Sequence, residues 1–281
     1  MLLPSGVALD FSGPALVMAI INCNGDSFYA PSRALGEEAV EKALSAEKEG
    51  AAIVDFGAES SRPGASYISE EEELERLIPV ISSFRKRSAL PVSADTRKSS
   101  VAAAAIEAGA DIINDISALC DDPQMAQVCV EKGAAVVLMH KKGEPLTMQE
   151  NPSYSNLTEE IRAFFKDSIN RALAAGILRE KIILDPGIGF GKGLNDNLRI
   201  IRLLAEICGK DYPVLVGLSR KGFIGEITGR HDVARNAEGR LPGTLAANAA
   251  AILAGADIIR VHDVKEHVDL AKVLFSITRE Q

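Results

Sequence analysis

A short glycine motif recurs through the chain, each time directly before a run of small or branched aliphatic residues. Its copies are Gly50-Ala51, Gly109-Ala110, Gly133-Ala134 and Gly255-Ala256. Each copy follows a stretch in which apolar residues have helical spacing. Glycine readily ends a helix, and a continuous aliphatic run indicates a strand that is buried on both faces. The motif therefore predicts a repeated turn from a helix into a buried parallel strand, the unit of an α/β fold.

Eight strand-like runs alternate with helical patterns. They cover approximately residues 16–22, 52–57, 91–95, 111–114, 135–140, 181–185, 213–218 and 257–262. Eight alternations favour a closed (β/α)₈ TIM barrel, and the 281 residues are close to the length of about 250 that is typical of one. A doubly wound open sheet is the alternative. No linker-like stretch divides the chain, so we expect one domain over residues 1–281, the barrel over about 16–278, and the first fifteen residues against its bottom.

Composition excludes several classes of function. The net charge of −8 argues against a nucleic acid or an anionic membrane surface as partner. We see no signal-peptide pattern and no apolar run near the ~18 residues that span a bilayer. The four cysteines are scattered without C-x-x-C spacing, as expected of free thiols in a reducing compartment. We therefore expect a cytoplasmic protein.

Polar or ionisable residues end nearly every predicted strand or follow it. In a barrel, these ends share one mouth, where the chemistry of such folds takes place. Asp95, Asn114 and Asp185 suit a planar, nitrogen-rich ring that donates hydrogen bonds. A second group suits a phosphate or pyrophosphate: Arg62, Lys221, Arg260 and His262. Asn22 could hold a divalent cation alongside phosphate oxygens.

Some of these residues also have purely structural interpretations. Asp55 and Asp115 could cap helices or pair locally, and His140 could be a histidine with satisfied hydrogen bonds. Arg220 could point outward, since only one of Arg220 and Lys221 needs to face the mouth. His267 looks like a surface residue.

The ordered motifs at the strand ends resemble those of the dihydropteroate synthase family. They are Asp26-Ser27-Phe28, Glu59-Ser60-Ser61-Arg62-Pro63-Gly64, Asp95-Thr96, Asn114-Asp115-Ile116, Met139-His140, Asp185-Pro186-Gly187-Ile188-Gly189-Phe190-Gly191-Lys192, Ser219-Arg220-Lys221 and Arg260-Val261-His262. The resemblance runs from about residue 16 to the end of the chain. It implies a pterin-binding (β/α)₈ barrel that joins p-aminobenzoate to hydroxymethyl-dihydropterin pyrophosphate in folate biosynthesis.

The resemblance also implies roles for individual residues. The pterin ring would be held by Asp95, Asn114, Asp185 and Lys221. The pyrophosphate would be bound by Asn22, Arg62, Arg260 and His262, with Mg²⁺ near Asn22. The p-aminobenzoate, with which sulfonamides would compete, would be received by Ser61, Arg62, Phe190, Ser219 and Lys221. The residues expected to act in catalysis are Asp95, Asp185, Lys221, Arg260 and His262. By analogy with the family, we expect a homodimer.

The first loop departs from the family pattern. Asn24-Gly25 stands where the family commonly has Thr-Pro, and Tyr29-Ala30-Pro31-Ser32 replaces an Asp-Gly-Gly run. Three alternatives therefore stay open: a pterin-binding methyltransferase, an inactive paralogue, and a phosphate-binding metabolic barrel of another class. The methyltransferase would have no need for a pyrophosphate site.

Overall fold

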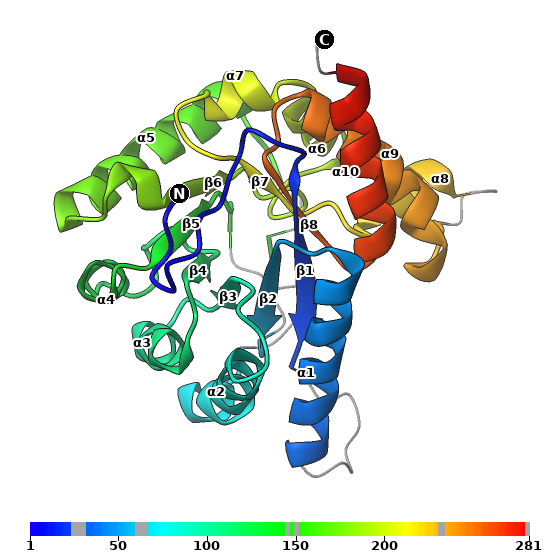
Figure 1. Ribbon diagram of the computed structural model, residues 1–281. Coiled ribbons are helices and arrows are strands. Elements are labelled where there is room, and N and C mark those ends of the chain that lie inside the picture. The colour runs from blue at the N-terminus through cyan, green and yellow to red at the C-terminus, as the bar shows by residue number, and fades with distance from the viewer. Residues whose placement is uncertain (24–31, 60–66, 144–146, 149–151, 230–233, 279–281) are drawn as a thin grey trace.

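Eight parallel strands alternate with helices along the chain (Figure 1). The structure is a computed structural model that describes residues 1–23, 32–59, 67–143, 147–148, 152–229 and 234–278, with the backbone alone for residues 32–35. The strands are β1 Leu16–Asn22, β2 Ile53–Gly57, β3 Val92–Asp95, β4 Ile112–Asp115, β5 Ala135–Met139, β6 Ile182–Asp185, β7 Leu215–Val216 and β8 Ile258–Val261. The α-helices are α1 Ser32–Glu49, α2 Glu70–Arg85, α3 Ser99–Ala108, α4 Met125–Lys132, α5 Leu157–Ala175, α6 Leu194–Arg202, α7 Leu204–Cys208, α8 Gly222–Thr228, α9 Leu241–Leu253 and α10 Val264–Thr278.

The strands form a nearly closed barrel. Their order is β6-β5-β4-β3-β2-β1-β8-β7, with parallel pairing throughout. An isolated parallel bridge between Leu184 and Val214 joins β6 to the residues just before β7. The predicted TIM barrel is therefore confirmed, and the open-sheet alternative is wrong.

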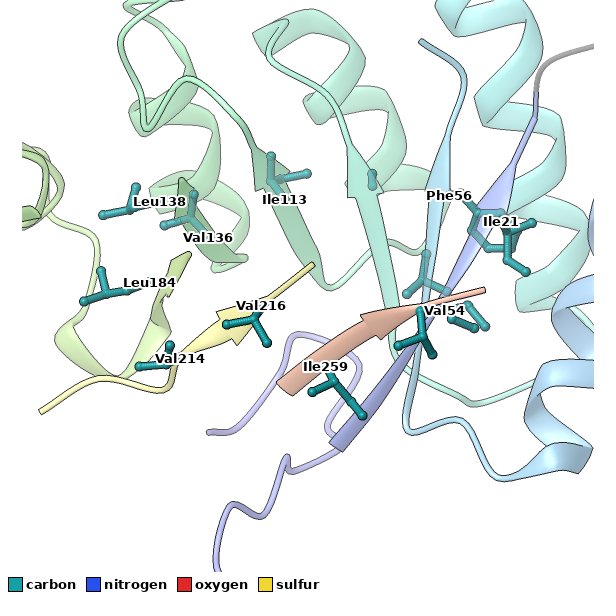
Figure 2. Close-up of a cluster of buried hydrophobic side chains, with 14 of the residues drawn as sticks. Ile21, Val54, Phe56, Ile113, Val136, Leu138, Leu184, Val214, Val216 and Ile259 are labelled. Atoms are coloured by element: carbon teal, nitrogen blue, oxygen red, sulfur yellow. The ribbon is translucent and has the colours of Figure 1, made fainter. Parts of the chain in front are cut away.

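Side chains of the strands alternate between the helical layer and the barrel interior, as the two-residue period of a strand requires. The outward set packs with the surrounding helices in the larger hydrophobic core. Figure 2 shows part of this set: Ile21, Val54, Phe56, Ile113, Val136, Leu138, Leu184, Val214, Val216 and Ile259. The glycine motifs connect helices to these strands, and Gly109, for example, has a φ of 116° and caps α3.

The N-terminal segment closes the bottom of the barrel, as predicted. Leu3 and Leu9 are buried in one cluster with the lower inward-facing strand residues, including Met18 and Ile53. The backbone N–H of Ser5 donates to Asp111 Oδ1 at 2.9 Å, which ties the segment to the start of β4. The apolar plug forces any ligand toward the opposite end of the barrel.

Three details differ from the expectation. The alternation predicts one helix between β6 and β7, but the structure has two, α6 and α7, separated at Leu203; the short helix α8 was not anticipated either. Strand β7 covers two residues only; Pro213, at the expected start, has no N–H to contribute to a sheet.

In the part of the chain that the structure describes, no helix combines the length and the apolar character needed to cross a bilayer.

His267, expected at the surface, is fully buried. It lies on the core-facing side of α10, at helical spacing from the buried residues Val264, Val268 and Ala271. Its Nδ1 faces the carbonyl oxygen of Asp263, and its Nε2 lies 3.0 Å from Asn248 Nδ2. The ring therefore donates from Nδ1 and accepts at Nε2, and the spacing of α10 could have revealed its burial.

Candidate active site

A cavity of about 750 Å³ lies at the carboxyl ends of the strands. Nine of the predicted site residues line it: Asn22, Asp95, Asn114, Asp185, Phe190, Ser219, Lys221, Arg260 and His262. The other two, Ser61 and Arg62, lie outside the described residues. The barrel thus brings together side chains that are separated by up to 240 positions in the sequence (262 − 22 = 240).

The side chains that form the floor of the cavity are placed there by the alternation of inward and outward side chains along the even-numbered strands. Each of these strands places an isoleucine inward at the lower level: Ile53, Ile112, Ile183 and Ile258. Two residues later, the side chain again points inward, one layer higher. These four positions hold polar residues: Asp55, Asn114, Asp185 and Arg260. The apolar plug therefore continues directly into a charged layer.

Arg260 lies between two carboxylates in this layer. Its Nε donates to Asp55 Oδ2 at 2.6 Å, and its Nη2 donates to Asp95 Oδ2 at 2.8 Å. Asn114 Nδ2 lies 3.4 Å from Asp55 Oδ2, which orients the amide group of Asn114. Asp55 is fully buried, and its Oδ1 has no hydrogen-bond partner among the described residues. Arg260, which the sequence places with the anion-binding residues, is thus in direct contact with the acidic residues of the cavity.

The proton affinity of Asp95 is strongly perturbed by this arrangement. Burial raises the pKa of Asp95 to about 7, although the positive charge of Arg260 acts in the opposite direction and the charge of Asp55 adds to the rise. The two carboxylates raise the pKa of Arg260 despite its burial, so this guanidinium stays charged. A carboxyl group that titrates near neutrality inside a cavity is typical of a functional site.

Asp185 and Lys221 form the second charged part of the cavity. Burial raises the pKa of Asp185, while a hydrogen bond of 2.7 Å from the backbone N–H of Gly187 to Oδ1 opposes that rise. Lys221 Nζ donates to the carbonyl oxygen of Ile188 and lies 4.4 Å from the centre of the Phe190 ring. Burial lowers the pKa of Lys221 to about 8.

The loop between β6 and α6 shapes this side of the cavity. Gly187 has a φ of 64°, and a Cβ there would lie 1.9 Å from the carbonyl oxygen of His140. A Cβ on Gly191 would lie 2.1 Å from the carbonyl oxygen of Lys142. Only glycine permits so close an approach to the segment after β5. The loop is further fixed by Asn197, whose Oδ1 accepts from the N–H of Gly189 at 2.8 Å.

Ser219 and His262 lie where β7 and β8 open into the cavity. The Oγ of Ser219 lies 2.9 Å from His262 Nδ1 and accepts from the backbone N–H of His262 at 3.2 Å. The neighbouring Arg220 has a φ of 56° and pairs with Asp263, its Nε lying 3.0 Å from Oδ2. Arg220 is also among the residues that line the cavity, while its guanidinium is directed to Asp263, which is not among them.

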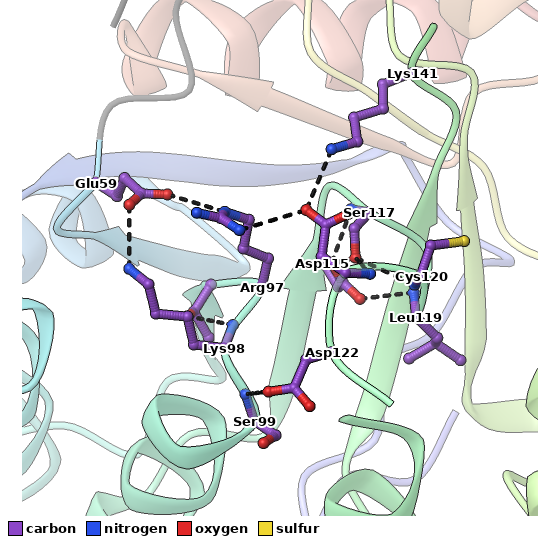
Figure 3. Close-up of polar contacts among 12 residues, drawn as sticks. Glu59, Arg97, Lys98, Ser99, Asp115, Ser117, Leu119, Cys120, Asp122 and Lys141 are labelled. Carbon is purple, nitrogen blue, oxygen red and sulfur yellow. Dashed lines mark hydrogen bonds and ion pairs between the residues drawn. The ribbon is translucent and has the colours of Figure 1, made fainter. Parts of the chain in front are cut away.

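A network of charged side chains connects the rim of the cavity between β2 and β5 (Figure 3). Glu59, which lines the cavity, lies 3.3 Å from Arg97 Nε and 3.1 Å from Lys98 Nζ. Arg97 and Lys141 both pair with Asp121, at 3.5 and 3.2 Å. These pairs join the loops that follow β2, β3, β4 and β5.

Two of the structural interpretations are confirmed. Among the described residues, the carboxylate of Asp115 bonds to the turn after β4, accepting from the N–H and Oγ of Ser117 and the N–H of Leu119. His140 is buried, and burial together with the charge of Lys192 lowers its pKa to about 2, so its ring is neutral. The cysteines of the described residues are free thiols, as expected.

Two participants were missed in the sequence. Asp55 is one, although an aspartate within an aliphatic strand run is an unusual residue that could have revealed a functional layer. Lys192 is the other: its side chain is buried beside Asp185 and also lines the cavity. A lysine that directly follows a glycine-rich loop at a strand end was the available signal.

The donor set around Asn22 determines what metal this region could bind. Asn22 is exposed at the end of β1 and lines the cavity. The described residues contain no group of three or more His, Cys, Asp or Glu that could hold a metal ion. Mg²⁺ is often bound by one or two protein oxygens together with substrate phosphates and water. The amide oxygen of Asn22 fits that mode and does not fit an all-protein metal cage.

Comparison with known proteins agrees with this site. Residues 18–262 match the family of pterin binding enzymes. The dihydropteroate synthase of Escherichia coli strain K12 is 42% identical over 274 residues, which cover 97% of this chain and 95% of that protein.

Solved structures show the same likeness. The Yersinia pestis dihydropteroate synthase with a sulfonamide drug superposes with a TM-score of 0.89, at 38% identity and 97% coverage of both chains. The Xanthomonas albilineans enzyme in complex with 7,8-dihydropteroate gives a TM-score of 0.84, at 37% identity, and covers 97% of this chain and 96% of that chain. The chain therefore belongs to the pterin-binding enzyme family and, within it, to the dihydropteroate synthases.

Proposed function

We propose that this chain joins p-aminobenzoate to 6-hydroxymethyl-7,8-dihydropterin pyrophosphate and releases 7,8-dihydropteroate and pyrophosphate. The observation that carries the proposal is the composition of one cavity. Its floor has three hydrogen-bond-accepting side chains, those of Asp95, Asn114 and Asp185, while Lys221 and His262 supply donors at its edge. This combination suits a flat ring with several N–H groups that carries an anionic leaving group.

The floor would bind the pterin and stabilise the charge that develops on it. As the bond from the methylene carbon to the pyrophosphate oxygen breaks, positive charge spreads from this carbon into the ring. The carboxylates of Asp95 and Asp185 would stabilise that charge, because a fixed group in a buried site interacts strongly with a charge that forms only in the transition state. The amide of Asn114 would orient the ring, because Asp55 restrains its Nδ2.

The leaving pyrophosphate and the attacking amine would occupy the upper part of the cavity. Asn22, Arg62 and His262 would bind the pyrophosphate, together with Arg260, whose Nη1 takes part in neither of its two ion pairs. The p-aminobenzoate would lie against Ser61, Arg62, Phe190, Ser219 and Lys221. Its neutral amine attacks the methylene carbon and then loses a proton. A sulfonamide, which resembles p-aminobenzoate in shape, would compete there.

Mg²⁺ is the proposed cofactor. Bound through the amide oxygen of Asn22 and the substrate, it would neutralise charge on the pyrophosphate. A homodimer is the proposed assembly; exposed apolar side chains on α9 and α10 support it, namely Leu253, Val273 and Ile277. We also propose that the protein acts in the cytoplasm, for which the free thiols are the support.

The direct test measures pyrophosphate release from the pterin substrate, with and without p-aminobenzoate and Mg²⁺, in the wild type and in Asp185→Asn. We expect release that requires Mg²⁺, yields dihydropteroate with p-aminobenzoate, and falls by at least about 100-fold in the variant. No release from folded wild type would refute the proposal. Pterin binding would then distinguish a methyltransferase or an inactive paralogue from a barrel of another class.

A further inference from the structure

Lys192 has a buried amine with an unusually complete set of acceptors. Its side chain is 2% exposed. Nζ lies 2.9 Å from His140 Nδ1 and 2.9 Å, 3.0 Å and 3.2 Å from the carbonyl oxygens of Gly187, Phe190 and His140. The three carbonyl oxygens can only accept, so together they require the three N–H groups of an ammonium, whereas a neutral amine has two. The geometry therefore selects the ammonium form.

The charge of Lys192 is balanced locally. Burial lowers the pKa of Lys192 well below its ordinary value and the charge of Lys221 adds to this, whereas the neighbouring carboxylate of Asp185 opposes it. The positive charge of Lys192 in turn opposes the rise in the pKa of Asp185 that burial causes. Because His140 accepts the hydrogen bond at Nδ1, its own proton is on Nε2. Lys192 and Asp185, which both line the cavity, thus each offset part of the cost of burying the other's charge.

The contacts of Lys192 connect two segments of the barrel rim. His140 directly follows β5, whereas Gly187 and Phe190 belong to the loop after β6. This loop presents three features to the cavity. The N–H of Gly187 donates to Asp185, and the carbonyl oxygen of Ile188 accepts from Lys221. The ring of Phe190 lies below the Lys221 amine. Lys192 is therefore attached to the groups that place both Asp185 and Lys221.

We propose that Lys192 is a positioning residue of the synthase reaction, whose ammonium holds the β6–α6 loop against the end of β5 and so fixes Asp185, Phe190 and Lys221 around the pterin ring. Its charge also opposes the rise in the pKa of Asp185 that burial causes. This inference rests on the function proposed above, and it assigns to Lys192 a task that is separate from contact with the reacting atoms.

The test compares Lys192→Met and Lys192→Arg with a matched control, Lys142→Met. Lys142 also bonds to a backbone carbonyl, that of Ser153 at 2.7 Å, and pairs with Glu160 at 2.9 Å, but its side chain is 45% exposed and does not line the cavity. Each variant is characterised by its melting temperature, by kcat and KM for both substrates, and by the pH profile of kcat/KM.

We expect Lys192→Met to raise KM for the pterin substrate by about 10- to 100-fold. The acidic limb of its kcat/KM profile should move to higher pH, because Asp185 loses a positive neighbour and its pKa rises. Lys192→Arg should keep the acidic limb of the wild type and still raise KM, because a planar guanidinium cannot reach the same four acceptors. Lys142→Met should change neither KM nor the profile.

Folded Lys192→Met with the KM and pH profile of the wild type would overturn the proposal, since a purely structural residue changes only the folded fraction. If Lys192→Met does not fold, the test relies on Lys192→Arg. A wild-type KM in Lys192→Arg would likewise overturn the proposal. If the wild type binds the pterin without turnover, the synthase proposal fails instead. The pterin dissociation constants of the same variants then test the position of the loop directly.

Discussion

Asp55→Asn is the substitution that tests the charged floor of the barrel most directly. Asp55 does not line the cavity, and it acts through Arg260 and Asn114, to which its Oδ2 is hydrogen bonded. Asparagine has nearly the same shape but removes the negative charge. We therefore expect Arg260 and Asn114 to lose their fixed orientation without a cavity forming in the core.

The size of the effect follows from the geometry. Breaking a buried ion pair costs about 3–5 kcal/mol when the remaining charge is left alone. Here Asp95 Oδ2 remains 2.8 Å from Arg260 Nη2, so part of the charge stays compensated. We expect the free energy of unfolding to fall by about 2–3 kcal/mol. If the substitution also destabilises the transition state of the reaction by about 2 kcal/mol, kcat/KM for the pterin falls about 30-fold.

The loss of stability should depend on pH. Burial and the charge of Asp55 raise the pKa of Asp95 from 3.8 to about 7, against the effect of Arg260. The native state thus keeps a proton that the unfolded chain releases. This contribution to stability is complete below pH 3.8 and is lost as the pH rises through about 7. Asp55→Asn lowers the pKa of Asp95, so the variant loses less stability over that range. The difference from wild type should therefore be smaller at high pH, by about 1.4 kcal/mol for each tenfold change in the acid constant of Asp95.

Urea unfolding at about pH 5.5 and at about pH 8.5, together with steady-state kinetics, measures both effects. The control is Asp211→Asn, which removes the exposed partner of Arg179 at 3.0 Å and should change neither quantity. An Asp55→Asn variant that loses the same free energy at both pH values and keeps its kcat/KM would refute the reasoning.

Three further predictions follow from individual contacts. In Gly187→Ala, the free energy of unfolding from thermal denaturation should fall by at least about 2 kcal/mol, because the new Cβ would lie 1.9 Å from the His140 carbonyl oxygen. Gly13→Ala is the control, because a Cβ there has no atom within 4 Å, and equal melting temperatures of the two variants would contradict the argument. The pKa of Lys221, lowered to about 8 by burial, predicts that kcat/KM for the pterin declines above pH 8 in wild type; Lys221→Arg should remove this basic limb of the pH–rate profile, and an identical limb in both would show that another group titrates. Leu9→Ala should lower the free energy of unfolding by about 2–4 kcal/mol in urea while folded enzyme keeps its kcat/KM, and a change in kcat/KM would mean that the plug contributes to the site.

The sequence was informative wherever a local rule applied. Gly109 and Gly133 end α3 and α4 in the left-handed region, and the aliphatic runs after them form buried strands. These are properties of a few consecutive residues, so they can be recognised without knowledge of the rest of the fold. The end of β6 at Asp185 was predictable for the same reason, because a proline and a glycine follow it directly.

The sequence failed where a residue is determined by a distant partner. The assignment of Arg260 to an anion-binding group stays a prediction, but its pairing with Asp55 and Asp95, which are 205 and 165 positions away, was not anticipated. His267 was expected at the surface, but Asn248 on the preceding helix α9 accommodates it in the core. Such pairings depend on which strands and helices become neighbours.

The amino-acid sequence by itself thus determined the repeating helix–strand unit, the polar residues at the strand ends and the family resemblance. Only the tertiary structure decided that Asp55, Asn114, Asp185 and Arg260 form one layer above an isoleucine layer, and that Lys192 connects the ends of β5 and β6 at the cavity wall. The physical reason is barrel closure, which brings inward-facing side chains of strands far apart in sequence within reach of one another, where burial strengthens their interactions.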